Sequence, residues 1–254
     1  MTELLGLPYS PWSEKARWAL DVRHVPYKSV TYAPLLGELG LRRRTAKWSG
    51  PVSVPVLFVD GGRAIADSAE IARWADTCGD GPVLFPTDLE ADVVRYVALS
   101  EKALDAGRCL ALHRVLRDDA ALREMVPKQL RGTGALGRAG LRAAEFGVRR
   151  TLRKYGAGRV DAAIHESNLR AVLDELRAAL AGATATGEPR TLLGRFTFAD
   201  VAMTQALGFV EPPSFGLRIG AASRRTFTDD RLRESYADLV AWRNAVYEAY
   251  RPRV

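Results

Sequence analysis

The residue pair with the clearest chemical potential is Ser10-Pro11, which follows a short apolar run and precedes a helical pattern. Proline is favoured at the first helical position, so the pair predicts Ser10 as the N-cap of that helix. A capping hydroxyl lies close to the positive end of the helix dipole, where an anion such as a thiolate gains about 0.3 to 1 kcal/mol. From these residues alone, a plain capping serine is the simpler interpretation.

Two further pairs could contact a ligand through backbone and side-chain polar groups. Val54-Pro55 leads into a β-prone run, and its ordinary interpretation is a trans proline that starts a strand. Asp67-Ser68 leads into an apolar helical pattern, where a serine is most often a helix cap. Each pair is weak evidence when taken separately.

The other reactive residue types form no recognisable constellation. They are His24, His113, His165, Cys78 and Cys109. The histidines lack the spacing of metal ligands, and the two cysteines lie far apart without a CxxC pattern, so we expect no metal site and no disulfide framework. Glycine-rich phosphate loops are absent from the sequence, which gives nucleotide-dependent chemistry no support.

The charge of the chain is concentrated in one segment. The 254 residues carry 37 Lys plus Arg and 30 Asp plus Glu, a formal net charge of +7. Residues 1–127 hold 16 basic and 17 acidic side chains, residues 128–159 hold 9 and 1, and residues 160–254 hold 12 and 12. The sequence therefore describes a near-neutral protein with one basic segment rather than a generally basic one.

The elements that must position these residues fall into two groups. An apolar fraction of 47% excludes disorder along the whole chain. The hydrophobic periodicity predicts strand, helix, strand, helix, strand, strand, helix over about the first 77 residues, at 3–7, 12–22, 27–32, 35–48, 54–59, 63–66 and 68–75. A Pro/Gly-rich linker follows, and the rest is predicted as mainly helical, with helices at 88–116, 160–180, from 195, and 232–250.

This layout, together with four local patterns in order, is similar to that of cytosolic glutathione transferases. The patterns are Ser10-Pro11-Trp12-Ser13, Val54-Pro55, Asp67-Ser68 and Thr197-Phe198-Ala199-Asp200. The chain is identified as a serine-type, bacterial-like member of the cytosolic glutathione transferase superfamily with an enlarged helical domain. The resemblance implies an α+β fold, with a thioredoxin-like, glutathione-binding domain at 1–78 and an all-α helical domain at 88–254.

The resemblance also implies a catalytic role for Ser10, with Ser13 as the fallback if the register of the motif is shifted. The hydroxyl would stabilise the thiolate of glutathione without attacking the substrate itself. A cysteine at position 10 would have permitted thiol exchange, so a serine favours addition or substitution over glutaredoxin-like reduction.

Further residues are implied to bind glutathione as co-substrate. Val54, before a cis Pro55, would pair through its backbone with the cysteinyl unit, in the manner of an added strand. Asp67 would take the ammonium of the γ-glutamyl end and Ser68 its carboxylate. Thr197 and Asp200 read as a structural capping box without a catalytic role.

One departure from the family pattern concerns the glycyl carboxylate. Family members often place a basic donor two or three residues before the cis proline, but here the residues are Val52 and Ser53. We expect Lys47, or one of Arg42, Arg43 and Arg44, to substitute. Without such a donor, glutathione affinity would be weak, and the use of another thiol, or of no thiol, becomes an alternative.

Residues 119–158 form an insert that the family usually lacks, and its basic part is predicted as an amphipathic helix. Arg138, Arg142, Arg149 and Arg153 fall within an arc of about 60°, beside an apolar stripe. The insert could cap the electrophile site, bind an anionic partner, membrane or nucleic acid, or simply dock its stripe on the domain. The glycines at positions 132, 134, 137, 140 and 147 argue against a long isolated helix.

Two functions compete at this point. The first is a glutathione transferase-like enzyme that conjugates or isomerises a small hydrophobic electrophile. The resemblance implies a homodimer that acts in detoxification. A cytoplasmic location is expected because the chain lacks a signal-peptide pattern and an 18-residue apolar run. The alternative is a non-catalytic ligand- or partner-binding protein on the same fold.

Overall fold

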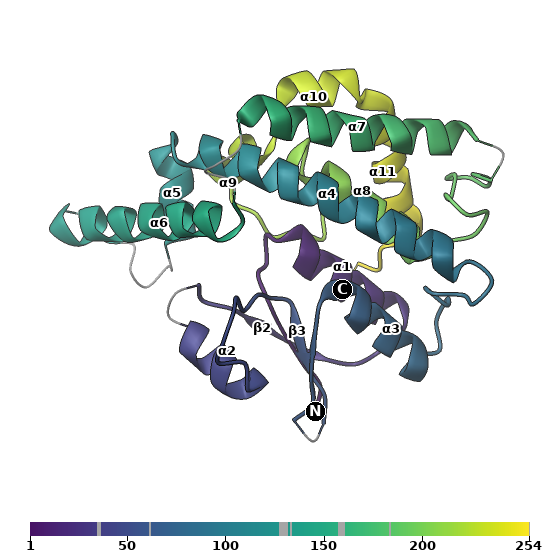
Figure 1. The fold of residues 1–254 in the computed structure, drawn as a ribbon, viewed down its shortest axis with the longest axis horizontal. Helices are drawn as coiled ribbons and strands as arrows, with labels where there is room; N and C mark the ends of the chain where they lie inside the picture. Colours follow the sequence, from purple (N-terminus) through teal and green to yellow (C-terminus); the bar gives the residue numbers. More distant parts are fainter. Residues whose placement is uncertain are drawn as a thin grey trace.

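The first 78 residues fold into a four-stranded mixed sheet with helices on both faces, and nearly all of the rest is helical (Figure 1). The predicted α+β class, with a thioredoxin-like domain followed by a helical one, is confirmed. The computed structural model describes residues 1–34, 37–60, 62–126, 132, 134–156, 161–182 and 184–253.

The sheet has the strand order β2-β1-β3-β4, in which β1 pairs parallel with β2 and antiparallel with β3. β3 and β4 form the predicted antiparallel hairpin. The elements of this domain are β1 Glu3–Gly6, α1 Pro11–Val22, β2 Lys28–Thr31, α2 Glu38–Thr45, β3 Val56–Phe58, β4 Ala64–Ala66 and α3 Ser68–Cys78.

Side chains alternate across the strands and so decide which helix covers which face. Leu4 and Leu57 lie in a cluster with residues of α1 and α3. Their neighbours Leu5 and Val56 point the other way and pack with Leu41 of α2. The sheet is therefore covered by α1 and α3 on one face and by α2 on the other, as Figure 1 shows.

The second part of the chain is built around the long helix α4, which packs against α7 and α8. In Figure 1 these helices lie above the sheet and above α1. The elements are α4 Glu90–Val115, α5 Asp119–Met125, α6 Gly134–Lys154, α7 Ala162–Ala181, α8 Phe198–Ala206, the 3-10 helix η2 Leu207–Phe209, α9 Ala221–Phe227, α10 Asp230–Ser235 and α11 Ala237–Tyr250.

Trp18 joins the two parts, because this α1 residue is fully buried against the helical domain. Its ring centroid lies 4.5 Å from that of Tyr247 and 6.2 Å from that of Phe196. Its indole nitrogen donates to the carbonyl oxygen of Tyr250 at 3.0 Å. The helix that begins beside Ser10 is thus fixed between the sheet and the C-terminal helices.

Two helical expectations need correction. The helix predicted at 232–250 is two helices, α10 and α11, because Tyr236 has the non-helical backbone angles φ −123° and ψ 33°. The tyrosine ring is buried at this break, where its hydroxyl donates to Asp174 at 2.9 Å.

In the basic insert, α6 runs for 21 residues in spite of its glycines. It forms because it is not isolated: Val148 and Leu152 are buried in a cluster with residues of α4, α5 and α9, and Leu141 and Ala144 pack against the same cluster. The docked apolar stripe, one of the alternatives left open by the sequence, is therefore what the structure shows.

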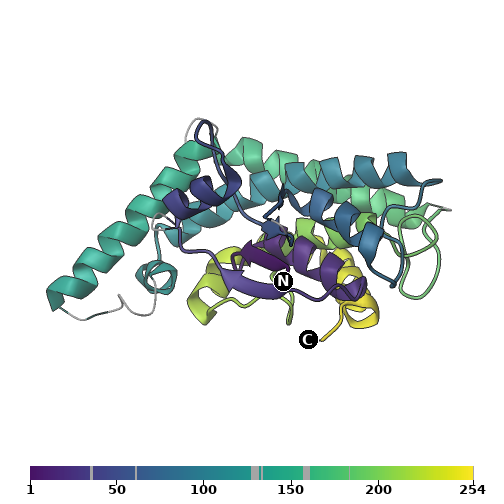
Figure 2. The same ribbon diagram turned by 90° about the horizontal axis from the view of Figure 1, so that it is seen from below.

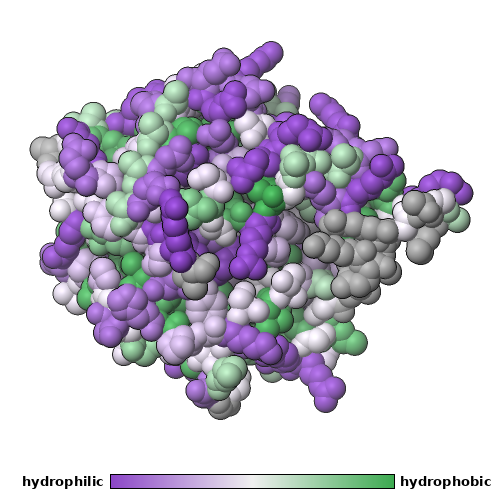
Figure 3. Space-filling model, turned by 180° about the vertical axis from the view of Figure 1, so that it is seen from behind, coloured by the Kyte–Doolittle hydropathy of each residue, from purple (hydrophilic) through white to green (hydrophobic). Residues whose placement is uncertain are grey.

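The surface opposite to the view of Figure 1 is covered mostly by polar side chains, and its hydrophobic residues are scattered (Figure 3). Within the described ranges, no helix is long and apolar enough to cross a membrane.

Candidate functional site

The sheet register brings the three predicted residue pairs to one end of the sheet. Val56 at the start of β3 pairs with Leu5 near the end of β1 and with Ala66 at the end of β4. The C-terminal end of β1, the N-terminal end of β3 and the C-terminal end of β4 therefore lie at the same end of the sheet. The segments at this edge carry Ser10-Pro11, Val54-Pro55 and Asp67-Ser68.

Ser10 is the N-cap of α1, with Pro11 as the first helical residue, as predicted. Its hydroxyl oxygen lies 3.5 Å from the backbone nitrogen of Ser13, and its own backbone nitrogen donates to the carbonyl of Leu7 at 3.2 Å. Only 8% of the residue is exposed. An anion beside this hydroxyl would meet the positive end of a 12-residue helix in a site largely closed to water.

Ser13, the fallback residue, has a different task. It is fully buried, and its hydroxyl oxygen accepts a hydrogen bond from the backbone nitrogen of Leu7 at 3.0 Å. The Ser13 side chain therefore holds the turn between β1 and α1.

Polar contacts to the helical domain fix the first turns of α1. The indole nitrogen of Trp12 donates to Glu101 at 2.7 Å, and the ammonium of the fully buried Lys15 contacts the other oxygen of the same carboxylate at 2.5 Å. On the other side of the helix, the fully buried Glu14 pairs with Arg251 near the C-terminus at 2.7 Å. The position of Ser10 is consequently set by both domains.

The peptide bond between Val54 and Pro55 is cis, as the resemblance implied. Pro55 is buried and Val54 is half-buried at the start of β3. Val54 also packs with Val52 against the small cluster under α2.

Asp67, rather than Ser68, caps α3, so the prediction of Ser68 as the cap is wrong. The Asp67 carboxylate accepts from the backbone nitrogen of Ala69 at 2.7 Å, and Ser68 is the first residue of the helix. Asp67 has φ +81° and ψ 137°, a conformation that costs a non-glycine residue about 1 to 3 kcal/mol. Asp67 is exposed, while Ser68 is only 2% exposed. At this end of the sheet, an exposed carboxylate on a strained backbone therefore lies next to a buried hydroxyl.

The cations proposed for the glycyl carboxylate lie on and after α2. The guanidinium of Arg42 binds Glu38 at 2.9 Å and the carbonyl of Gly50 at 3.1 Å. The guanidinium of Arg44 pairs with Glu3 at 2.6 Å and lies 3.6 Å from the centre of the Phe58 ring. Both guanidinium groups are thus already bound to partners within the protein.

Arg43 and Lys47 have exposed side chains, and the backbone of Lys47 is tied to Arg42. A further cation, Lys154 at the end of α6, was not predicted as a candidate. Its ammonium donates to the carbonyl oxygen of Val52 at 2.5 Å.

An aromatic wall lies next to Ser10. Tyr9 and Trp12 pack against the cluster that contains Phe209, and the ring centroids of Trp12 and Phe209 are 6.4 Å apart. Burial raises the pKa of Tyr9 to about 12, so its phenol stays protonated at neutral pH.

Arg108 of α4 adds a cation to this wall. The guanidinium carbon lies 4.7 Å from the centre of the Trp12 ring and 3.5 Å from that of Tyr155, which directly follows α6. The guanidinium also pairs with Asp105 at 2.5 Å. The stack joins α1, α4 and the basic insert beside the predicted thiol site.

The capping box at the start of α8 is present as predicted. The Asp200 carboxylate accepts from the backbone nitrogens of Thr197 and Leu192 at 2.9 and 2.8 Å. Both Thr197 and Asp200 are fully buried, and the desolvation raises the pKa of Asp200 to about 6. This is a structural contact inside the helical domain.

The histidines and cysteines take no part in a cluster. His24 contacts Asp80 at 2.8 Å on the surface, and Cys78 and Cys109 are both free. Among the described residues, no group of three or more metal-ligating side chains comes together.

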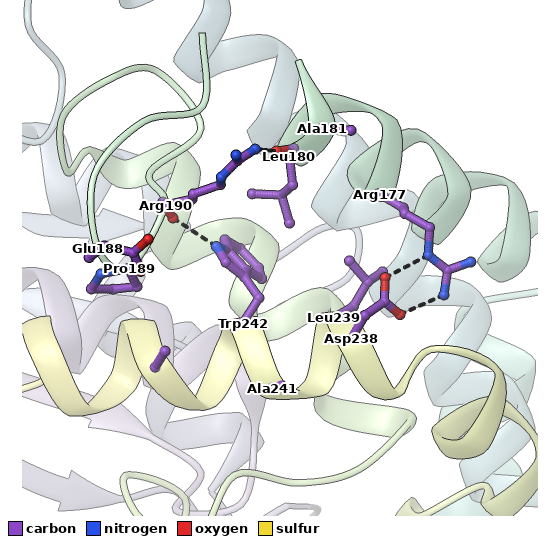
Figure 4. Close-up of a pocket in the computed structure, with 11 residues that line it drawn as sticks. Arg177, Leu180, Ala181, Glu188, Pro189, Arg190, Asp238, Leu239, Ala241 and Trp242 are labelled. Atoms are coloured by element: carbon purple, nitrogen blue, oxygen red, sulfur yellow. Dashed lines mark hydrogen bonds and ion pairs between the residues drawn. The ribbon is translucent and has the colours of Figure 1, made fainter. Parts of the chain in front are cut away.

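A shallow pocket of about 500 Å³ lies elsewhere, between the end of α7 and α11 (Figure 4). In Figure 4 Trp242 points toward the loop before α8, where its indole nitrogen donates to the carbonyl of Arg190 at 2.8 Å. Arg177 and Asp238 pair at its rim at 2.6 Å. The residues that line it belong to the helical domain alone, so we do not connect it with Ser10.

Comparison with known proteins finds a family match for the N-terminal domain. Residues 9–78 match the family of glutathione S-transferase N-terminal domains. Probable glutathione S-transferases from Solanum tuberosum and Nicotiana tabacum are each 32% identical to the chain, over 93 and 88 residues. These matches cover 34% of the chain and 38% and 37% of the two relatives, so the similarity spans little more than a third of each curated protein.

Solved structures extend the similarity to the whole fold. A glutathione transferase from Phanerochaete chrysosporium has a TM-score of 0.66 at 18% identity, covering 99% of this chain and 98% of that one. A glutathione S-transferase from Methylobacterium radiotolerans in complex with glutathione sulfonate has a TM-score of 0.56 at 20% identity, covering 100% and 95%. Together with the matched N-terminal domain, these likenesses show that the chain has the fold of glutathione transferases.

Proposed function

We propose that the protein is a glutathione transferase-like enzyme that joins glutathione to a small hydrophobic electrophile, with Ser10 stabilising the thiolate. The observation that carries the proposal is the convergence of Ser10-Pro11, Val54-Pro55 and Asp67-Ser68 at one end of the sheet. Solved relatives in complex with glutathione, from Ceriporiopsis subvermispora and Methylobacillus flagellatus, share the fold and support the same ligand.

The roles within the tripeptide site follow from the chemistry of each group. The backbone of Val54 would pair with the cysteinyl unit at the open end of the sheet. The Asp67 carboxylate would attract the γ-glutamyl ammonium, while the Ser68 hydroxyl and the first backbone N–H groups of α3 would bind its carboxylate. The thiol would then lie at the start of α1, beside the hydroxyl of Ser10.

Ser10 would act by lowering the pKa of the bound thiol. A hydrogen bond to a charged group contributes about 1.5 to 3 kcal/mol and the helix dipole about 0.3 to 1 kcal/mol. At about 1.36 kcal/mol per pKa unit, these could lower a thiol pKa from about 8.5 by roughly two units. The thiolate fraction at pH 7 would rise from roughly 3% to roughly 75%.

The electrophile would lie against the aromatic wall next to Ser10. Tyr9, Trp12 and Phe209 offer apolar surface there, and an apolar wall suits a small hydrophobic substrate. Isomerase or lyase variants would use the same thiolate.

Calorimetric titration with glutathione tests the proposal, combined with a pH titration of the ultraviolet absorbance of the bound thiolate. We expect binding, and a thiol pKa that rises by one to two units in Ser10→Ala. Tyr9→Phe is the matched control, because it removes a hydroxyl one residue away and should leave the thiol pKa unchanged. Absence of glutathione binding by the wild type would refute the transferase proposal, whereas an unchanged thiol pKa in Ser10→Ala would refute only the role of Ser10.

We also propose that the insert binds an anionic partner, because the outer face of α6 carries four exposed arginines: Arg138, Arg142, Arg149 and Arg153. Among described residues, only Arg149 of these has an ion-pair partner, Glu145 at 2.8 Å. Retention on a polyanion such as heparin should weaken steeply with salt and weaken further in Arg138→Glu/Arg142→Glu. Salt-independent behaviour would dismiss this second role.

Assembly as a homodimer, a cytoplasmic location and a role in detoxification remain predictions of the family resemblance. Light scattering of the purified protein over a range of concentrations tests the first of them. We expect a mass of about twice that of the single chain.

A further inference from the structure

Helix α6 crosses from the helical domain to the thioredoxin-like domain and is bound there at two points. Arg150 pairs with Glu38 of α2 at 2.8 Å, and Lys154 donates to the carbonyl of Val52 at 2.5 Å. Figure 1 shows α6 above α2 at the side of the molecule where the two domains face each other. The basic insert thus reaches the segment that leads into β3.

The other side of α6 is fixed by packing. Val148 and Leu152 are 6% and 5% exposed within the cluster that also holds Phe209, and the Tyr155 ring stacks on the guanidinium of Arg108. Lys154 is therefore carried on a helix end that is held between the two domains, which reduces the entropy its side chain would lose on binding a ligand.

The contact of Lys154 with the carbonyl of Val52 places a positive charge beside the chain two residues before Val54. Val54 is the residue proposed to pair with the tripeptide. A carbonyl oxygen occupies one of the three N–H donors of an ammonium group, which leaves two for a ligand. The side chain is exposed, and none of the carboxylates in the described part of the chain pairs with it. It is thus a charge available to a ligand at this edge.

Two other cations near this segment are less available. Arg42 is bound to Glu38 and Arg44 to Glu3, as described above. The local sequence itself has the uncharged residues Val52 and Ser53 before the cis proline. A tripeptide bound along Val54 would end in a carboxylate with no partner from this segment.

We propose that Lys154 binds the C-terminal glycyl carboxylate of the tripeptide, so that α6 completes the thiol site with a residue from the helical domain. The inference rests on the proposed function, since it presupposes that glutathione binds along Val54. It makes Lys154 a specificity-determining residue for thiols that carry a carboxylate beyond the cysteinyl unit. No bond is made or broken in this step; the recognition is one of charge and hydrogen bonding.

The test compares glutathione with its glycyl monoethyl ester, which keeps the tripeptide but lacks that carboxylate charge. Calorimetry would give the affinity of both ligands for the wild type, Lys154→Gln and Lys154→Arg. An exposed ion pair is worth about 1.4- to 5-fold in affinity. We expect Lys154→Gln to lose about that factor for glutathione and nothing for the ester, and Lys154→Arg to recover most of it.

Two controls isolate the position of the charge. Arg153→Gln removes an equal charge from the adjacent residue, and Lys47→Gln removes the cation that the sequence favoured. Both should leave glutathione affinity nearly unchanged. If Lys47→Gln rather than Lys154→Gln weakens glutathione selectively, the assignment to Lys154 is wrong.

The remaining outcomes are also decisive. Equal losses for both ligands in Lys154→Gln would mean that Lys154 supports the structure without reading the carboxylate, which overturns the inference but not the proposed function. If the wild type binds glutathione and no variant changes that affinity, the inference is likewise overturned while the proposed function stands. If the wild type binds neither ligand, the proposed function fails and the inference fails with it.

Discussion

The hydroxyl oxygen of Ser10 lies 3.5 Å from the backbone nitrogen of Ser13, at the long limit of an N–H···O hydrogen bond. The contact stabilises α1 weakly, and it uses the hydroxyl only as an acceptor. The hydroxyl hydrogen remains available to donate, so Ser10 can cap the helix and stabilise an anion at the same time.

The two serines of this turn should differ in their contribution to stability. Ser10→Ala loses only a long cap bond, so we expect the free energy of unfolding to fall by less than about 1 kcal/mol. Ser13→Ala leaves the backbone nitrogen of Leu7 without its 3.0 Å partner in a buried turn, which should cost about 1 to 3 kcal/mol. Urea unfolding of both variants measures the difference, and equal losses would contradict the assignment of separate roles.

Substitutions of Asp67 should separate the effect of its charge on glutathione affinity from the effect of its helix cap on stability. Asparagine caps helices as well as aspartate does and tolerates a positive φ, so Asp67→Asn should change the free energy of unfolding by less than about 0.5 kcal/mol. If the carboxylate attracts the γ-glutamyl ammonium, the same variant should bind glutathione about 1.4- to 5-fold more weakly.

Asp67→Ala is the control for the cap, since it keeps the strained φ and loses the bond to Ala69. We expect it to be destabilised by about 1 to 2 kcal/mol in urea unfolding. Unaltered glutathione affinity in Asp67→Asn would remove the carboxylate from the proposed site.

Much of the N-terminal domain could be predicted because its signals are local. The strand at 3–7 and the turn between β3 and β4 depend on neighbouring residues, and both appear in the structure. The cis bond before Pro55 followed from the family motif rather than from propensity. Where two adjacent residues compete for one cap, as Asp67 and Ser68 do, local propensity cannot decide, because both types cap helices well.

The basic insert was less predictable, because tertiary packing decides its structure. Glycines lower the helix propensity of α6, but burial of Val148 and Leu152 outweighs that cost. The contact of Lys154 with Val52 joins residues 102 positions apart, and no sequence pattern predicts a contact of that kind.

Acidification should break the ion pair between Arg150 of α6 and Glu38 of α2. The hydrogen bond from Arg42, with that from Arg150, lowers the pKa of Glu38 below its ordinary value of 4.5. A lowered pKa in the folded state means that the stabilising contribution is complete above about pH 4.5 and is lost as the pH falls through the folded value.

The magnitude should be modest, about 0.2 to 1 kcal/mol, because Arg150 is well exposed. The free energy of unfolding of the wild type should exceed that of Glu38→Gln at pH 7, and the difference should narrow below pH 4.5. Arg150→Gln should share this pH dependence in part, since it removes one of the two partners. A difference that is independent of pH would show that the Glu38 contacts contribute through packing rather than charge.

Asp200 should show the opposite pH dependence, because its burial raises its pKa from 3.8 to about 6. Asp200→Asn at pH 7 presents an amide NH2 to the backbone donors of Thr197 and Leu192, which should destabilise the protein by about 2 to 4 kcal/mol. Between pH 7 and pH 5 the folded wild type takes up a proton that the unfolded chain does not, so its stability gains about 1 kcal/mol relative to the variant. In urea unfolding, the loss of stability caused by Asp200→Asn should therefore be larger at pH 5 than at pH 7. Thr197→Ala keeps the carboxylate, and it should lower the free energy of unfolding by about 0.5 to 2 kcal/mol at pH 7. A deficit of Asp200→Asn that shrinks on acidification would mean that the buried hydrogen bonds hold the carboxylate ionised against the cost of burial.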